Sequence, residues 1–354
     1  MRPRLRNARA KWGPVAGRVA LAALAVGALA LSPVRAEQFT LVTAPAPGIG
    51  GGTTAFVDAV DGRRIVEIDR AGKVVWQCAL DQARFKSDEL QRGADLEWIR
   101  SDDSFLVAIP FSGIFRIDRK CNVIWQYRTS KVSHDADLLP NGNVLYTYAW
   151  DDTSDAQAVE VDPSGRIVWS WRAHGRLDPS WKSISTDGDS AGDLRGGSRR
   201  SGGGSGQGGG RGEGYTHANA VVRLADGDTL VSLRNFHRVV RVGRDGAVKR
   251  AYGPINRVHD PSLLPDGRLV AADHVPMSVV ILGNGPPRVL FSNPIDMKPI
   301  RTVEPLANGN FLVAGGRDIV EINGAGAILW HVRVYASLGA RVRDGVYKAV
   351  RVAK

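Results

Sequence analysis

Cysteine is scarce in this chain, and apolar runs long enough to cross a membrane are missing from it. The 354 residues include two cysteines, Cys78 and Cys121, and no zinc-binding motif. The apolar run at residues 19–31 is too short for a membrane span. The two cysteines would be able to pair in an oxidising compartment, or they could remain free thiols. The sequence leaves both possibilities open.

Acidic residues are absent from residues 1–36. The basic residues of this segment are Arg2, Arg4, Arg6, Arg9, Lys11, Arg18 and Arg35. With the apolar run and the small residues Val34 and Ala36, they are typical of a signal peptide cleaved before Glu37. Its removal leaves +4 of the formal charge of +11. We expect a periplasmic or secreted protein with one domain at residues 37–354; a retained N-terminal anchor is the alternative.

Basic stripes with interleaved aromatic residues are also lacking, so we expect no nucleic-acid partner. What the chain does contain is a repeated phrase of β-branched residues, a turn and an aromatic residue. Residues 65–69 turn at Gly72 into Val74, Val75 and Trp76. Five further copies end at the aromatic residues Trp125, Trp169, Tyr252, Phe291 and Trp330.

A second phrase, Leu-Pro-Asn-Gly-Asn before an apolar run, precedes the first at residues 139–145 and returns in variant form at 264–270 and 306–312. Such Asn-Gly and Asp-Gly pairs between apolar runs indicate hairpins. Each unit of about 40 residues therefore contains four short strands, which is typical of a propeller blade. Six units predict an all-β protein, a six-bladed β-propeller.

The chain ends suggest how the ring closes. The first repeat lacks an inner strand before Phe56, whereas residues 346–352 are strand-like and have no repeat of their own. We expect this last segment to form the innermost strand of the first blade, because an open ring would expose a sheet edge. A frayed tail is the alternative. An insertion at about residues 172–214 is rich in Gly, Ser and Arg, which predicts a mobile loop, either a lid or a passive linker.

Aligning the repeats on their turn glycine reveals a column of residues at the start of the predicted inner strands. The column contains Asp95, His134, His217, His259 and Arg301. Inner strands line the channel of a propeller, so these residues are expected to form a ring at one mouth. A single channel histidine is more often structural than functional. Three histidines in one ring beside an arginine favour a functional site.

A second column, seven residues after the turn glycine, contains Arg234 and His274, and we expect it to face the same mouth. Imidazoles serve as nucleophiles, bases or metal ligands. The guanidinium fork matches the oxygens of a sulfate, phosphate or carboxylate, and cationic groups repel a metal dication. We therefore expect an anion site without metal or cofactor, and a three-histidine zinc or copper site is the rival use.

Three stretches of the sequence share short motifs. They are residues 133–143, with Ser-His-Asp and Leu-Pro-Asn-Gly-Asn; residues 216–234, which begin Thr-His-Ala-Asn and end Ser-Leu-Arg; and residues 259–267, with His-Asp and Leu-Pro-Asp-Gly. In this order and spacing they resemble the arylsulfotransferase family of bacterial periplasmic enzymes, and the similarity covers most of the chain after residue 36. It implies a propeller that transfers a sulfuryl group from a phenolic sulfate ester to another phenol, without a nucleotide donor.

The resemblance also implies roles for single residues. His259 corresponds to the channel histidine that becomes transiently sulfated, and His134 activates the phenol or binds the sulfuryl group. Arg301 is added from the column alone. The residues expected to bind the substrate oxygens are His217, Asn219, Arg234 and Arg301.

Two other functions stay open at this point. A non-catalytic exported propeller could use the same mouth to bind a partner protein or an anionic polymer. An envelope enzyme that uses pyrroloquinoline quinone or a metal is a third possibility, because the tryptophan phrases resemble those of quinoprotein propellers; their place in outer strands fits blade packing better. The expected partners are a small aryl sulfate and a phenol, and the sequence does not specify the oligomeric state.

Overall fold

The strands of this computed structural model form six antiparallel sheets. The structure describes residues 39–60, 62–148, 151–183, 214–334 and 345–353, all within the compact unit of residues 37–354. The expected signal segment, residues 1–36, lies outside the described residues, as do residues 184–213 of the expected insertion.

Each of the first three sheets contains four strands, which run in the following order from the inner edge outward. Sheet 1 contains β25 (Ala349–Val352), β2 (Thr53–Asp58), β3 (Arg64–Ile68) and β4 (Val74–Ala79). Sheet 2 contains β5 (Asp95–Ile99), β6 (Ser104–Ile109), β7 (Gly113–Ile117) and β8 (Val123–Tyr127). Sheet 3 contains β9 (Ala136–Leu138), β10 (Val144–Thr147), β11 (Ala158–Val161) and β12 (Ile167–Trp171).

The last three sheets follow the same pattern, with one strand added to the sixth. Sheet 4 contains β13 (Ala218–Arg223), β14 (Thr229–Leu233), β15 (Arg238–Val242) and β16 (Val248–Tyr252). Sheet 5 contains β17 (His259–Leu263), β18 (Leu269–Asp273), β19 (Ser278–Leu282) and β20 (Arg288–Phe291). Sheet 6 contains β21 (Thr302–Pro305), β22 (Phe311–Gly315), β23 (Asp318–Ile322), β24 (Ile328–Val334) and β1 (Phe39–Thr43).

Helical structure is confined to short turns in the described part of the chain. These turns are α1 (Gln82–Phe85), η1 (Ser87–Arg92) and η3 (Arg234–Phe236). The first two connect blade 1 to blade 2, and η3 connects β14 to β15. The protein is therefore an all-β protein, as the repeats predicted.

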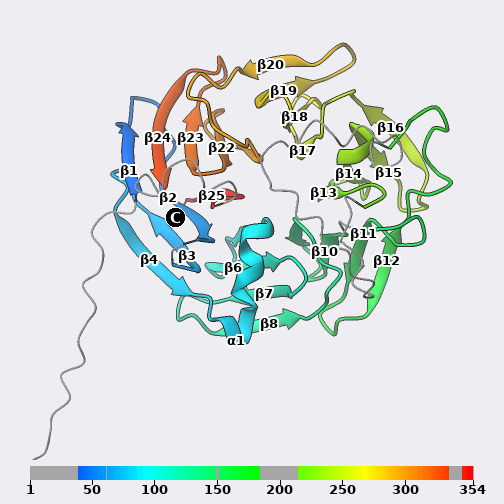
Figure 1. Cartoon of the computed structure of the whole chain (residues 1–354), viewed down its shortest axis with the longest axis horizontal. Helices are drawn as coiled ribbons and strands as arrows, with labels where there is room; N and C mark the ends of the chain where they lie inside the picture. The colour runs from blue at the N-terminus through cyan, green and yellow to red at the C-terminus, as the bar shows by residue number, and fades with distance from the viewer. Residues whose placement is uncertain (1–38, 61, 149–150, 184–213, 335–344, 354) are drawn as a thin grey trace, which may run out of the picture. The chain divides into compact units, whose positions relative to one another are not determined.

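The six sheets form a ring with one strand of each at the centre (Figure 1). Neighbouring inner strands contact each other in the order β25, β5, β9, β13, β17 and β21, and β22 then contacts β25. The six-bladed propeller is thus confirmed. In sheet 1, β25 pairs antiparallel with β2, with Val352 opposite Thr53. This strand is shorter than the segment expected at residues 346–352, because Val346 forms only an isolated bridge with Gly316.

The recurring tryptophans link neighbouring blades. Each is in an outer strand and donates its indole N–H to a backbone carbonyl in the next blade. The pairs are Trp76 with Arg119 (3.0 Å), Trp125 with Pro163 (2.9 Å), Trp169 with Arg244 (3.1 Å) and Trp330 with Arg70 (2.8 Å). In the two degenerate repeats, Tyr252 and Phe291 end the outer strand and are buried. The repeated phrase therefore encodes the contact between blades: the aromatic ring buries apolar surface, and the indole N–H forms a directional hydrogen bond.

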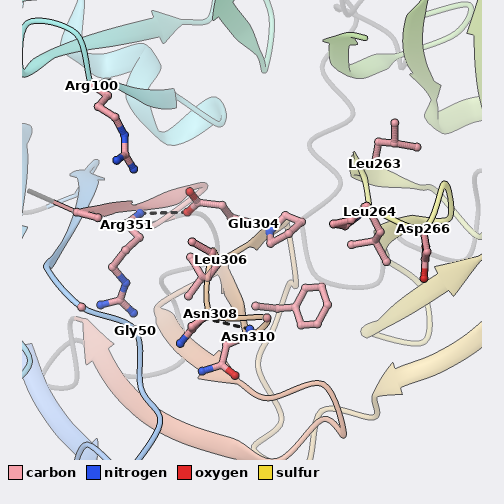
Figure 2. Close-up of a pocket in the computed structure, with 17 residues that line it drawn as sticks. Gly50, Arg100, Leu263, Leu264, Asp266, Glu304, Leu306, Asn308, Asn310 and Arg351 are labelled. Carbon is pink, nitrogen blue, oxygen red and sulfur yellow. Dashed lines mark hydrogen bonds between the residues drawn. The ribbon is translucent and has the colours of Figure 1, made fainter. Parts of the chain in front are cut away.

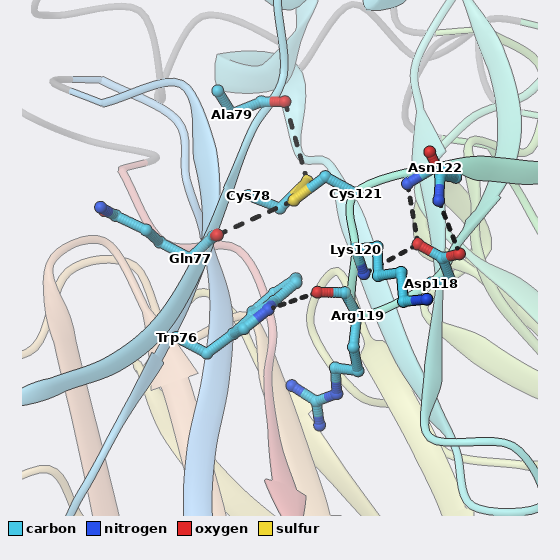
Figure 3. The surroundings of a disulfide bond; sticks show 9 residues. All are labelled: Trp76, Gln77, Cys78, Ala79, Asp118, Arg119, Lys120, Cys121 and Asn122. Atoms are coloured by element: carbon cyan, nitrogen blue, oxygen red, sulfur yellow. Dashed lines mark hydrogen bonds between the residues drawn. A yellow bond between two sulfur atoms is a disulfide. The ribbon is translucent and has the colours of Figure 1, made fainter.

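A disulfide adds a second link between blades 1 and 2 (Figure 3). It joins Cys78 in β4 to Cys121 in the turn between β7 and β8, with 5.6 Å between the Cα atoms. The bond between Trp76 and Arg119 lies beside it. Of the two possibilities left open by the sequence, the structure contains the paired form.

Candidate functional site

The predicted column lies where the inner strands begin. Asp95 and His259 are the first residues of β5 and β17. His217 and Arg301 come one residue before β13 and β21, and His134 comes two residues before β9. Because these inner strands lie side by side around the centre, the column residues come together at one end of it.

Two groups of rings occupy this end. In the first, the His134 ring stacks with the His217 ring at 5.4 Å between centroids and with the Tyr347 ring at 5.2 Å. In the second, the His259 ring stacks with the His274 ring at 4.9 Å.

The Arg301 guanidinium joins the two groups, because it lies 3.1 Å from Nε2 of His259 and 5.8 Å from the centre of the Tyr347 ring. Arg234 is buried and close enough to both His259 and His274 to act on their titration. We name this set the histidine mouth; it consists of His134, His217, Arg234, His259, His274, Arg301 and Tyr347. His274 was expected to face the mouth without a role, and Tyr347 was not singled out in the sequence.

β-Bulges set the direction of two of these inner strands. The pairing of β13 with β14 shifts between Ala218 and Val221, and that of β17 with β18 shifts between His259 and Ser262. His217 has a φ of +48°, and Asp260 has a φ of +44°. Bulges turn side chains away from the regular alternation and are frequent beside active sites. In this propeller they adjoin the two histidines of blades 4 and 5.

The tautomer of His259 follows from its two hydrogen bonds. Its Nδ1 lies 2.7 Å from the carbonyl oxygen of Arg257, which can only accept, so Nδ1 carries the proton. Its Nε2 lies 3.1 Å from Nη1 of Arg301, which can only donate, so Nε2 offers its lone pair. Burial, assisted by His274, Arg301 and Arg234, lowers the pKa of His259 well below its ordinary value. His259 is therefore a neutral imidazole whose lone pair faces a cation.

His134 has the same orientation at its Nδ1. This atom lies 3.4 Å from the carbonyl oxygen of Gly93, so it is the donor, and Nε2 is the atom able to take up a proton. Gly93 has a φ of +101°, and a Cβ built there would lie 2.7 Å from Nδ1 of His134 and 2.8 Å from the Tyr347 ring. Only glycine fits at this position, which forms the wall behind both rings.

Asp151 positions His217, although nothing in the sequence singled it out. Its carboxylate accepts hydrogen bonds from the backbone N–H of His217 at 3.1 Å and from the hydroxyl of Thr216 at 2.9 Å. Gln157 donates a further bond at 2.8 Å. Asp151 comes from blade 3 and is buried, so it fixes the turn in which His217 adopts its positive φ.

Asn219 and Arg234 have protein partners. Nδ2 of Asn219 donates to the carbonyl of Val258 at 3.1 Å, one residue before His259, while its Oδ1 has no partner in the described part of the chain. Nη1 of Arg234 donates to Oδ1 of Asn235 at 3.1 Å. Asn219 thus supports the start of β17; its expected contact with substrate oxygens stays a prediction.

The imidazole of His274 is a second buried base in the histidine mouth. Burial and the cations Arg301 and Arg234 lower its pKa to about 3, and a hydrogen bond with the backbone of Ile300 partly offsets this effect. Among the described residues, Nδ1 of His274 has no hydrogen-bond partner. A hydroxyl or N–H of a bound ligand would satisfy it.

Next to the histidine mouth, six acidic side chains surround one ammonium group, that of Lys348. We name these acids the acidic layer; they are Asp95, Glu97, Asp135, Asp137, Asp260 and Glu304. Nζ of Lys348 lies 2.9 Å from Oδ1 of Asp95 and 3.5 Å from Oδ1 of Asp135. Burial alone would lower the pKa of Lys348, but these acids raise it well above its ordinary value, so the amine stays charged.

The acidic layer also connects inner strands that do not pair with each other. Five carboxylates accept a backbone N–H from the next inner strand around the ring. The pairs are Asp95 with Ala136 (3.4 Å), Glu97 with Leu138 (2.8 Å), Asp135 with Val221 (2.7 Å), Asp260 with Val303 (2.8 Å) and Glu304 with Arg351 (3.0 Å). Burial raises the pKa of Glu97 and of Glu304 to about 7. These bonds satisfy amides that would otherwise be buried without partners.

A cavity of about 780 Å³ lies near the C-terminal ends of inner strands (Figure 2). Arg100, Leu263 and Arg351 are among the residues that line it. Arg100 follows the last residue of β5, Leu263 is the last residue of β17, and Arg351 is the last but one of β25. The column residues Asp95 and His259 begin β5 and β17, so the cavity and the histidine mouth are at opposite ends of the channel. None of the predicted site residues lines this cavity.

The described residues contain no group of three or more His, Cys, Asp or Glu residues placed to hold a metal ion. The same part of the chain contains no helix that is long and apolar enough to cross a membrane.

Comparison with solved structures shows the fold. A protein of unknown function from Bacteroides caccae is 14% identical, with a TM-score of 0.56 over 86% of this chain and 100% of that one. A streptogramin B lyase is 12% identical, with a TM-score of 0.50 over 82% of this chain and 86% of that one. No curated protein matches the sequence.

Comparison with protein families gives a more specific result. The model of the arylsulfotransferase (ASST) family matches residues 35–262. The match includes His134, His217, Asn219, Arg234 and His259 and ends before the rest of the histidine mouth. It covers more than half of the chain, and the chain therefore belongs to the arylsulfotransferase family.

Proposed function

We propose that this protein transfers a sulfuryl group from a phenolic sulfate ester to a phenol through a sulfohistidine at His259. The observation that supports this most is the state of the His259 ring. Its Nδ1–H is held by the carbonyl of Arg257, and its Nε2 lone pair lies next to the Arg301 guanidinium. A neutral imidazole with an anchored N–H and a cation at its reactive atom suits attack on an anionic ester.

In the first step, the Nε2 lone pair attacks the sulfur, and the bond between sulfur and the aryl oxygen breaks with its electron pair leaving on that oxygen. The N–H bond of Arg301 that now points to Nε2 becomes available to a sulfuryl oxygen. Arg234 and His217 are the other donors proposed for these oxygens. Charge that develops on them in the transition state meets fixed cations and N–H groups.

In the second step, His134 takes the proton of the acceptor phenol at Nε2 as the phenol oxygen attacks the sulfur. The bond between Nε2 of His259 and sulfur breaks, and its electron pair returns to the nitrogen. His134 suits this role because Gly93 holds its Nδ1–H and leaves Nε2 as the basic atom. The two steps need no other reactant.

Two further proposals concern the export of the protein and the closure of the ring of blades. We propose that residues 1–36 direct export, which agrees with the disulfide between Cys78 and Cys121, since such bonds persist outside the cytosol. We also propose that the pairing of β25 with β2 closes the ring.

The experiment is to mix the protein with p-nitrophenyl sulfate and phenol and to follow the release of nitrophenol. Wild-type protein should release it, and His259→Ala should not, while its circular dichroism spectrum stays that of the wild type. His174→Ala, at an exposed histidine, is the matched control and should stay active. A wild-type protein inert toward aryl sulfates, or a fully active His259→Ala variant, would overturn the proposal. Inert protein that captures an anionic polymer would favour the non-catalytic alternative.

A further inference from the structure

The ammonium of Lys348 contacts carboxylates from two blades, and both carboxylates lie beside the backbone that holds His134. We propose that Lys348 positions His134 for its role as the base that takes the proton of the acceptor phenol. This inference rests on the proposed function. Lys348 lies beyond the part of the chain that the family model matches.

Three links join the start of β5 to the start of β9, and the ammonium of Lys348 forms one of them. The carbonyl of Gly93 holds Nδ1 of His134 at 3.4 Å. Oδ2 of Asp95 accepts the N–H of Ala136 at 3.4 Å. Nζ of Lys348 lies between Asp95 and Asp135, at 2.9 and 3.5 Å. Because Asp95 follows Gly93 by two residues and Asp135 follows His134 by one, the ammonium holds together the two backbones that orient this ring.

The two long hydrogen bonds need this support. Both the bond from Gly93 to His134 and that from Asp95 to Ala136 are at 3.4 Å, the weak end of the range. Asp95 and Asp135 are buried acids that repel each other when both are charged. Without a cation between them, the two carboxylates would separate, and the Gly93 carbonyl would move relative to His134.

Tyr347, the residue before Lys348, contacts the His134 ring directly. Tyr347 stacks on His134, with 5.2 Å between the centroids and 15° between the planes. Tyr347 and Lys348 are adjacent, so the segment that leads into β25 holds His134 from its face and from its backbone. The His259 ring, in contrast, is held by its own hydrogen bonds to Arg257 and Arg301.

The inference makes a prediction that a general loss of fold does not make. The donor step uses His259, and p-nitrophenolate is a weak enough base to leave without being protonated by a general acid. The acceptor step uses His134. A change at Lys348 should therefore spare the burst of nitrophenol that precedes turnover and slow the transfer to phenols, most of all to weakly acidic ones.

The test is a stopped-flow measurement with p-nitrophenyl sulfate, followed by turnover with a series of phenols of rising pKa. Lys348→Met should keep the wild-type burst and slow transfer by about 10- to 100-fold, part of what a general base contributes. Asp95→Asn, which keeps an acceptor for Ala136 but breaks the ion pair, should show the same pattern. Lys348→Arg should restore most of the transfer rate.

Glu304→Gln is the matched control, because Glu304 belongs to the acidic layer but bonds to Arg351 and not to the strand that carries His134. It should behave as the wild type. Wild-type transfer rates in both Lys348→Met and Asp95→Asn would overturn the inference, and so would an equal loss of burst and transfer. A wild-type protein that releases no nitrophenol from p-nitrophenyl sulfate would overturn the proposed function itself.

Discussion

The guanidinium of Arg301 donates a hydrogen bond to Nε2 of His259 across 3.1 Å, at the atom proposed to attack the sulfuryl group. Arg301 also lies over the ring of Tyr347, so it has a fixed position between the two ring groups of the histidine mouth. In the resting protein it therefore marks the place where the sulfuryl oxygens are expected to lie.

Arg301→Ala should lower kcat/KM for p-nitrophenyl sulfate by about 100-fold, because removing one donor to a developing anion costs that much in other enzymes. Arg301→Lys should recover only part of it, since an ammonium lacks the planar fork. Nitrophenol release measures both. Arg268→Ala, at an exposed arginine paired with Asp266, is the control. Equal rates for Arg301→Ala and the wild type would contradict the role.

The pH dependence of the donor step depends on the lowered pKa of His259. Burial, His274, Arg301 and Arg234 keep the ring neutral below the ordinary histidine value of about 6.5. The burst rate should therefore stay constant as the pH falls from about 8 through about 6.5. Removing a cation raises the pKa, so in Arg234→Ala the acid limb should move to higher pH. A wild-type limb centred near the ordinary value would contradict this assignment.

Gly93→Ala should reduce transfer to phenols, because the added methyl would meet His134 and the Tyr347 ring at 2.7 and 2.8 Å. The acceptor step should suffer more than the burst. Gly267→Ala is a matched control, since Gly267 also has a positive φ, +78°, but has no atom within 4 Å of a new Cβ. Similar transfer rates in the two variants would show that the contact with His134 does not matter.

The disulfide should contribute to stability by restricting the unfolded chain. Cys78 and Cys121 are 43 residues apart, for which the chain-entropy model predicts about 4 kcal/mol. Urea unfolding with and without dithiothreitol measures this contribution. The midpoint of the wild type should fall on reduction, and that of the Cys78→Ala, Cys121→Ala variant should not change with the reductant. A wild-type midpoint that ignores the reductant would contradict the prediction.

The fold was predictable because each blade repeats the same local chemistry. The phrase that ends at Trp76 encodes two strands, a turn and a contact with the next blade, and all of these depend on residues close in sequence. β1 was not predicted, since residues 39–43 carry no part of either phrase and become a strand only beside β24.

The histidine column was predictable for the same reason: the start of an inner strand is a fixed distance from its turn glycine. Tyr347 and Lys348 could not be found in this way. They acquire partners only when β25 reaches sheet 1, which places Lys348 next to Asp95 and Asp135, both more than 200 residues earlier in the chain. The orientation of Asn219 depends on the bulge in β13, which no pattern in the sequence marks.

The measurement that tests the central claim most directly is the mass of the protein after reaction with p-nitrophenyl sulfate in the absence of a phenol. The account predicts an adduct of one sulfuryl group on the peptide that contains His259, formed with an equal amount of nitrophenol and removed when phenol is added. An adduct on a different residue, or turnover in a His259→Ala variant, would contradict it.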